Sequence, residues 1–204
     1  MSSLAATKAN LIKAKKNLEL TREGYELLEE KRRILLNELA GLANLVAKAE
    51  EDVEQAIAKA YAVVDQAMME MGREKLEELS FAVGIKPELS FSSRQVVGVT
   101  LPAVHLEMVD HPPYFSPHQV SLYVDEAILR FKELLKLLAG LAEKKIALVR
   151  LALEARRTIH KVRAIEKVHL PALEKTIKFI SERLDEENRE AFSNQKWLKE
   201  KKFL

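Results

Sequence analysis

Residues 35–67 read LLNELAGLANLVAKAEEDVEQAIAKAYAVVDQA, and apolar side chains recur in this stretch at alternating steps of three and four residues. The same stepping begins at Leu4 and reaches Ala67, and sixteen of its nineteen positions are apolar, with Thr7, Thr21 and Arg32 as the exceptions. A 3.5-residue period held for this length is typical of a coiled coil with a left-handed supercoil. The apolar positions are Leu4, Leu11, Ala14, Leu18, Tyr25, Leu28, Leu35, Leu39, Leu42, Val46, Ala49, Val53, Ala56, Ala60, Val63 and Ala67.

A second stretch repeats the pattern from Val124 to Val162, with Lys145 as its polar exception. Beyond it the spacing changes to steps of four between Ile165 and Ile177, and Pro171 lies inside this change of phase. Extra steps of four unwind a coiled coil locally, and a proline removes a backbone donor and kinks a helix. We expect a bend or stutter near residues 165–173. The positions of the second stretch are Val124, Ala127, Phe131, Leu134, Leu138, Leu141, Lys145, Leu148, Ala152, Ala155, Ile159 and Val162.

The segment between these stretches has a different composition. Five of the six prolines fall between Pro87 and Pro117, and residues 95–106 are β-branched and partly alternating, which indicates a small β-hairpin or two short strands. Gly72 marks an expected break in the first helix, with a shorter helix after it. Ser116 is an expected helix cap, with Pro117 at the first position of the second long helix.

The sequence therefore predicts an all-α fold, a long antiparallel two-helix coiled-coil hairpin with a small β-hairpin-like insert in its middle. The expected parts of this single structural unit are an N-terminal coiled-coil arm over residues 1–80, the insert over residues 81–117 and a C-terminal coiled-coil arm over residues 118–204. A continuous intramolecular hairpin buries both apolar stripes.

Composition narrows the classes of function. Charged residues make up 31% of the chain, aromatics 6%, and the net charge is only +2, which argues against a nucleic-acid-binding protein. The absence of cysteine excludes disulfides, thiolate metal sites and a cysteine nucleophile. Residues 1–6 lack the apolar core of a signal peptide, and we expect a cytoplasmic protein. If it serves a membrane, it does so through partners.

Motifs for chemistry are weak. No pair of glycines has the spacing of a phosphate-binding loop. Glu166 and His169 match one copy of the Glu-x-x-His spacing of di-iron bundles, which require a second copy that is missing. Three loop histidines at positions 105, 111 and 118 fit no recurring zinc spacing. We therefore expect no catalytic residue, no metal and no cofactor.

Basic residues gather at the two chain ends and along residues 144–167. The first eighteen residues contribute a charge of +4 and the last fourteen +3. In an antiparallel hairpin these ends would lie side by side, which predicts a basic tip of lysines with Trp197 and Leu198 among them. Solvated helix faces, with lysines complementing the helix dipole, are the alternative explanation.

Several segments, in order and with similar spacing, resemble the D subunit of V/A-type rotary ATPases. They are the opening ATKANL at residues 6–11, LLEEKRRIL at residues 27–35, VGVTLP at residues 97–102, RRTIHKVRAIE at residues 156–166, and the later Pro171, IKFI at 177–180, LDEE at 184–187 and closing lysines. The chain departs from the family pattern at Ala6, Arg33 and Arg163.

The resemblance implies a central-stalk rotor that transmits torque between ATP hydrolysis or synthesis in a catalytic hexamer and ion translocation in a membrane ring. The implied partners are the catalytic and regulatory subunits of the hexamer, the small F subunit of the stalk and a socket subunit above the ring, with neither nucleic acid nor direct membrane insertion. The choice between synthesis and hydrolysis, and between H⁺ and Na⁺, belongs to other subunits. The expected partner-interface residues are Lys8, Leu11, Lys15, Arg32, Val96, Val97, Val99, Leu101, Arg156, Arg157, Arg163, Lys196, Trp197, Leu198 and Lys201.

Two other classes of protein compete with this interpretation. A non-rotary cytoplasmic coiled-coil scaffold or tether would explain the heptads equally well, but not the β-like insert or the match of the C-terminal segments. A metal-binding helical-bundle enzyme would need ligands that the chain does not supply in the required spacing.

Overall fold

The computed structural model describes residues 5–116, 118 and 120–202, with side chains up to Leu198. In chain order it contains α1 (Lys8–Met71), α2 (Arg73–Ala82), β1 (Lys86–Val96), β2 (Val99–Val109), α3 (Leu122–Ala164), a π-helix (Ile165–His169) and α4 (Leu170–Lys202). Long helices with one two-stranded antiparallel sheet between them confirm the predicted fold class. The chain forms two compact units, a terminal unit of residues up to Arg33 and from Ala155 onward, and a central unit, Ile34–Glu154.

The start of α1 is set by Thr7. Its side-chain Oγ1 accepts a hydrogen bond from the backbone N–H of Asn10 at 3.2 Å, and its carbonyl accepts one from Leu11 at 3.0 Å. These contacts are those of an N-cap residue, which satisfies donors that the first helical turn leaves free. Thr7 is therefore a cap, although the heptad count placed it in the apolar stripe.

In the terminal unit, the first turns of α1 run antiparallel to α4. Arg22 Nη2 lies 2.9 Å from Glu174 Oε1, and Ala14 and Ile180 are both buried. The expected stutter is a π-helix, in which the N–H of Leu170 donates to the carbonyl of Ile165, five residues earlier. The wider turn ends just before Pro171, which has no N–H to continue the α-helical ladder.

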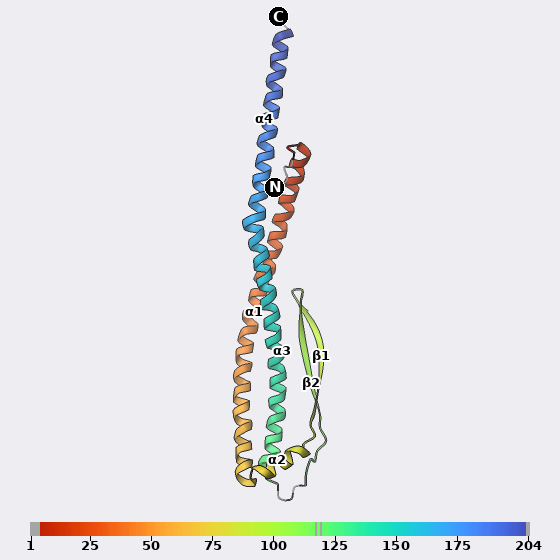
Figure 1. Cartoon of the computed structure of the whole chain (residues 1–204), viewed down its shortest axis with the longest axis vertical. Coiled ribbons are helices and arrows are strands. Elements are labelled where there is room, and N and C mark those ends of the chain that lie inside the picture. Colours follow the sequence, from red (N-terminus) through yellow and green to blue (C-terminus); the bar gives the residue numbers. More distant parts are fainter. Residues whose placement is uncertain (1–4, 117, 119, 203–204) are drawn as a thin grey trace. The chain divides into compact units, whose positions relative to one another are not determined.

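In the central unit, α1 runs antiparallel to α3 (Figure 1). Tyr61 and Phe131 meet edge-to-face with ring centroids 5.8 Å apart, and Lys145 Nζ lies 2.6 Å from Glu50 Oε1. The core lies between these two helices and follows the predicted heptad positions. Its buried members are Val46, Ala49, Val53, Ala60, Leu134 and Leu141.

The heptad assignment holds better for α1 than for α3. All described apolar positions of the α1 stripe are buried or half-buried, whereas Leu138, Lys145 and Ala152 on α3 are exposed. Ala147 and Leu151 are buried instead, although they lie off the predicted stripe. They share a helix face with Glu143 and Arg150, which bond the β-hairpin, so we infer that the hairpin covers them.

The insert is one β-hairpin that lies along α3 in the central unit (Figure 1). Its register runs from Lys86 opposite Val109 to Val96 opposite Val99. The two-residue turn has positive φ at both positions, 52° at Val97 and 77° at Gly98. This is the conformation that matches the twist of the flanking strands, and glycine adopts it without strain.

The second long helix starts later than the sequence predicted. Ser116 lies outside any helix, Pro117 is outside the described residues, and α3 begins at Leu122. Ser121 is the cap, since its Oγ accepts from the N–H of Tyr123 at 3.2 Å and its carbonyl from Val124 at 3.1 Å. A serine before a proline is a common start signal, but Ser121 precedes the first residue of the apolar stripe more closely.

Candidate partner interfaces

The edge of β2 that faces away from β1 is bonded by side chains of α3. Arg150 Nη1 donates to the carbonyl of Thr100 at 2.9 Å, and the N–H of Val104 donates to Glu143 Oε2 at 3.0 Å. Between them Pro102 has no N–H to offer. In an antiparallel pair, every second residue directs its backbone N–H and C=O away from the partner strand. Thr100, Pro102 and Val104 are such residues of β2. The contacts attach the hairpin to α3.

The other strand is open to solvent. Every residue of β1 is exposed except Val96, which is half-buried, and the side chains of Leu89 and Phe91 are 53% and 73% exposed. A long strand edge with free backbone groups and exposed apolar side chains is a ready site for a partner. β1 is therefore the strand of the insert that is more open to a partner.

Four of the expected partner-interface residues lie in the hairpin, and they differ in burial. Val96 and Val97 are half-buried, while Val99 and Leu101 are buried at 9% and 2% exposure. Val99 and Leu101 pack within the chain, so the expectation that they present apolar surface to a partner is wrong. Sequence alternation marked them as apolar but did not tell which strand would lie against a helix.

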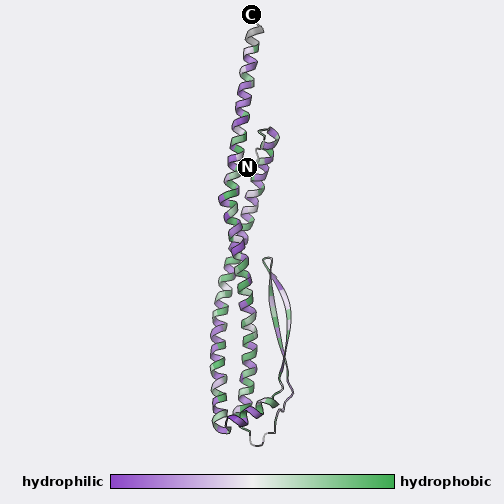
Figure 2. Ribbon diagram, in the orientation of Figure 1, coloured by the Kyte–Doolittle hydropathy of each residue, from purple (hydrophilic) through white to green (hydrophobic). Residues whose placement is uncertain are grey.

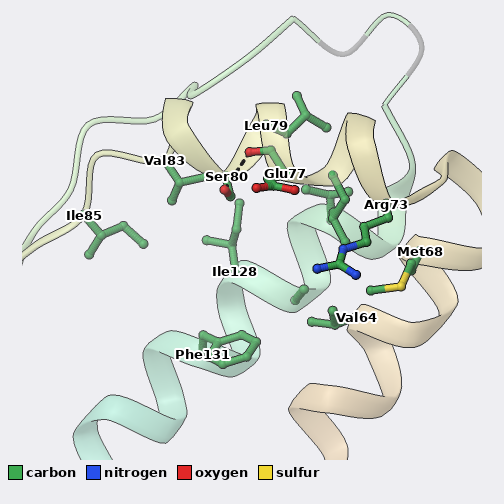
Figure 3. A pocket seen from close by; sticks show the side chains of 13 residues that line it. Val64, Met68, Arg73, Glu77, Leu79, Ser80, Val83, Ile85, Ile128 and Phe131 are labelled. Carbon is green, nitrogen blue, oxygen red and sulfur yellow. Dashed lines mark hydrogen bonds between the residues drawn. The ribbon is translucent and has the colours of Figure 1, made fainter.

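A second feature is an apolar cavity at the turn end of the central unit. Its volume is about 560 Å³, and α1, α2 and α3 all line it. In Figure 3, Val64 and Met68 of α1 and Ile128 and Phe131 of α3 lie beneath α2. Gly72, with φ 79°, provides the sharp turn from α1 into α2 and confirms the predicted break there.

The expected basic tip is not formed as predicted. From the Arg22–Glu174 contact, an equal step of fourteen residues along each helix leads to Lys8 and Asn188, so Lys8 is level with Asn188 and not with Lys196. Around Asn188 the chain is acidic, with Glu182, Asp185, Glu186, Glu187 and Glu190 against Arg183 and Arg189. The hairpin ends are unequal in length, and the lysines of α1 lie level with an acidic stretch of α4.

The predicted terminal residues lie on solvent-facing helix surfaces. Lys8, Lys15 and Lys196 are exposed, Leu11 is half-buried, and Trp197 and Leu198 are 55% and 58% exposed. The side chain of Lys201 lies outside the described residues. Figure 2 shows the last part of α4 as mostly hydrophilic.

The remaining predicted residues are arginines of the terminal unit. Arg32 is half-buried in the apolar stripe and pairs with Glu29 one turn earlier, while Arg156, Arg157 and Arg163 are exposed on α3. The Nε of Arg32 and the Oε2 of Glu29 are buried atoms without a hydrogen-bond partner among the described residues. A polar residue at a single position of an apolar stripe helps to specify the register of the paired helices.

The described residues also lack two features that would indicate other functions. They contain no group of three His, Asp or Glu side chains placed to hold a metal ion, and Glu166 and His169 are both exposed in the π-helix. Within the same part of the chain, no helix has the length and apolarity that crossing a bilayer requires.

Comparison with known proteins decides the family. The family model that describes the D subunit of ATP synthase matches residues 10–200 of the chain. The chain belongs to the ATP synthase D-subunit family. Among relatives in this family, the D subunit of the V-type ATP synthase of Thermotoga neapolitana is 33% identical over 199 residues, 98% of each chain. The D subunits of the A-type ATP synthases of Thermococcus sibiricus and Pyrococcus furiosus are each 31% identical over 196 residues, 95% of this chain and 92% of theirs.

Some residues of these sites were not predicted from the sequence, although they lie in the part of the chain that matches the D-subunit family. These are the apolar lining residues Leu76, Leu79 and Val83 and the cap Ser121. The spacing of Leu76, Leu79 and Val83 is typical of a short amphipathic helix, whose apolar face is expected to pack against another part of the protein.

Proposed function

We propose that the chain is the central-stalk rotor subunit of a V/A-type rotary ATPase or ATP synthase and is not itself catalytic. It would transmit torque between ATP hydrolysis or synthesis in the catalytic hexamer and ion translocation in the membrane ring. The observation that carries this proposal is the match of nearly the whole chain to proteins named as the D subunits of V-type and A-type ATP synthases.

The helices support a mechanical role. α1 is a single helix of 64 residues that contributes to both compact units, so its backbone hydrogen bonds connect them without a loop. Buried apolar residues pair α1 with α3 in the central unit and with α4 in the terminal unit. Paired helices resist twisting because rotation of one would expose apolar surface that the pair now buries.

Three surfaces are assigned to three kinds of partner in this proposal. The helix ends that carry Lys8, Leu11, Lys15, Lys196, Trp197 and Leu198 enter the hexamer of catalytic and regulatory subunits. The outer strand β1 takes the small F subunit of the stalk, and the turn end of the central unit seats on the socket subunit above the membrane ring. The protein works on the cytoplasmic side, peripheral to the membrane through the complex.

Reconstitution of the complex tests the rotor role. The complex is rebuilt in lipid vesicles from purified subunits with and without this chain, and ATP hydrolysis and ATP-driven ion transport are measured together. We expect transport to be lost without the chain while the hexamer retains hydrolysis. Full transport by a complex that lacks the chain would disprove the rotor role.

The assignment of the F subunit to β1 rests on the contrast between the two strands, since α3 bonds the free edge of β2 and leaves that of β1 open. The double change Leu89→Ser and Phe91→Ser removes exposed apolar surface and leaves the residues bonded to α3 in place. The F subunit is expected to bind this variant at least tenfold more weakly, measured by titration calorimetry. The matched control is Phe179→Ser, a 61% exposed aromatic on α4. Equal binding of both variants would reject β1 as the site.

A further inference from the structure

The turn end of the central unit exposes three large apolar side chains. Met69 is 86% exposed, Leu122 85% and Phe81 84%, the three highest values among the large apolar residues described. They belong to the last turn of α1, the first turn of α3 and the short helix α2. Ser121 ties the first two elements together, since it contacts both Met71 and Glu70. Clustered exposure of this kind marks an interaction site, whereas a single exposed leucine does not.

The cavity of about 560 Å³ lies at the same end, and its size is that of ligand-binding clefts. Its lining is mainly apolar and includes Val64, Met68, Leu76, Val83, Ile128 and Phe131 (Figure 3). Side chains around such a space lack packing partners on one side, so an occupant would gain dispersion contacts that the chain alone does not make.

Helix α2 covers the cavity without closing it. It has no buried residue, and its apolar residues Leu76 and Leu79 are half-buried. It is joined to α1 through Gly72 and followed by extended backbone at Val83. A ten-residue helix held by a glycine turn and a partly filled apolar face has little packing of its own to fix it, which suits a surface completed by a partner.

Charge indicates the chemistry of that partner. Residues 64–85 and 121–131, which include every lining residue of the cavity, contain seven acidic and three basic side chains, although the whole chain has a net charge of +2. Such a local field favours a basic partner surface and raises its rate of association. The acidic residues are Asp65, Glu70, Glu74, Glu77, Glu78, Asp125 and Glu126, and the basic ones are Arg73, Lys75 and Arg130.

We propose that the cavity between α2 and the two long helices receives a bulky apolar side chain from a partner protein, presented on a segment with Lys or Arg neighbours. Met69, Phe81 and Leu122 supply further exposed apolar surface at the same end of the unit, and the acidic side chains meet the basic neighbours. This inference rests on the proposed function in taking the socket subunit as that partner.

Filling the cavity from within tests the inference. Ser80 lines the cavity, is exposed, and has one described side-chain hydrogen bond, from its Oγ to the carbonyl of Glu77 at 2.7 Å, so Ser80→Trp adds volume there without removing an apolar contact. Ala82→Trp places the same side chain on the same helix at an exposed position outside the lining. Circular dichroism melting curves establish that both full-length variants fold.

Binding of the purified socket subunit is then measured by titration calorimetry. We expect at least tenfold weaker binding for Ser80→Trp and less than a twofold change for Ala82→Trp. If the unaltered chain does not bind the socket subunit, the proposed function is wrong as regards this partner. If the unaltered chain binds and Ser80→Trp binds equally well, the cavity inference alone is wrong.

A small neutral dye gives a readout that does not depend on the partner. N-phenyl-1-naphthylamine should fluoresce with the unaltered full chain and with Ala82→Trp, and much less with Ser80→Trp, and the socket subunit should displace it. Dye signals that are equal in all three proteins would show that the cavity is not an accessible apolar site.

The charge part of the inference has its own variant. Glu77→Lys combined with Glu78→Lys should weaken socket binding at least tenfold at low salt and by less at high salt, because ions screen exposed charges. Unchanged affinity at low salt would reject a basic partner segment.

Discussion

In the central unit, α1 and the β-hairpin both lie along α3, but their burial follows different rules. Each buried residue of α1 falls on the one apolar stripe that its own sequence displays. In the hairpin, Val99 and Leu101 are buried on β2, while Leu89 and Phe91, just as apolar, are exposed on β1. The buried face of a helix is encoded in its own periodicity, whereas the burial of a strand depends on which neighbour it meets.

The largest effect is expected in the helical core. Leu134 is 5% exposed and belongs to the core cluster, whereas Leu129 on the same helix is 59% exposed. Leu134→Ala should lower the free energy of unfolding by about 2–5 kcal/mol, because it leaves a cavity, and Leu129→Ala by less than about 1 kcal/mol. Urea unfolding followed by circular dichroism measures both. Equal losses would mean that the stripe does not define the core.

The same comparison can be made within the hairpin. Leu101→Ala, at a residue 2% exposed, is expected to weaken the packing of the hairpin by about 2 kcal/mol, and Phe91→Ala, at 73% exposure, by much less. Hydrogen–deuterium exchange of the peptides that cover β2 reports the difference, with faster exchange only for Leu101→Ala. Similar exchange in both variants would contradict the assignment of β2 as the inner strand.

The edge contact is expected to have a smaller effect. Glu143→Ala removes the acceptor of the Val104 N–H and should cost about 1 kcal/mol, seen as faster exchange of that amide by NMR. Lys136→Ala, an exposed position on the same helix, serves as the control. Protection of the Val104 amide in the Glu143 variant would show that the contact does not hold the edge.

The smallest effect belongs to the ion pair between Lys145 and Glu50, which are 51% and 50% exposed. Lys145→Met should change the stability by no more than about 1 kcal/mol, and added salt should reduce the difference. A larger, salt-independent loss would indicate that Lys145 contributes to packing and not to charge.

The sequence predicted the helices, the stutter and the insert because each leaves a local signature. A heptad count depends only on residue spacing, and Gly72 and Pro171 interrupt it where the structure changes. Burial of Ala147 and Leu151 could not be predicted in this way, because the hairpin that covers their face of α3 lies far away in the sequence. The lysines of α1 and α4 were expected together because the count assumed arms of equal length, whereas α4 extends past the start of α1.

The candidate sites, too, could be predicted only where a single segment of the sequence shows them. Apolar residues of the insert were recognisable, but the exposed strand was not, since Leu89 and Phe91 of β1 have the same alternating spacing as Val99 and Leu101 of β2. The cavity at the turn end was not predicted, because it arises where three helices meet and no single segment shows it.

The π-helix at Ile165–His169 tolerates a change in length that α4, which follows it, does not. Each residue of an α-helix advances the chain by about 100°, so losing one residue between Thr176 and Lys178 would rotate the following turns and carry buried Ile180 toward solvent. A π-turn contains one residue more than an α-helical turn of similar height. Deletion of one residue inside the π-helix would therefore convert it into an ordinary α-helical turn and preserve the orientation of Ile180. Pro171 would then meet an ordinary helical turn, in which its ring clashes with a carbonyl. We therefore expect a one-residue deletion within Ile165–His169, natural or engineered, to be tolerated when Pro171 is also replaced by another residue.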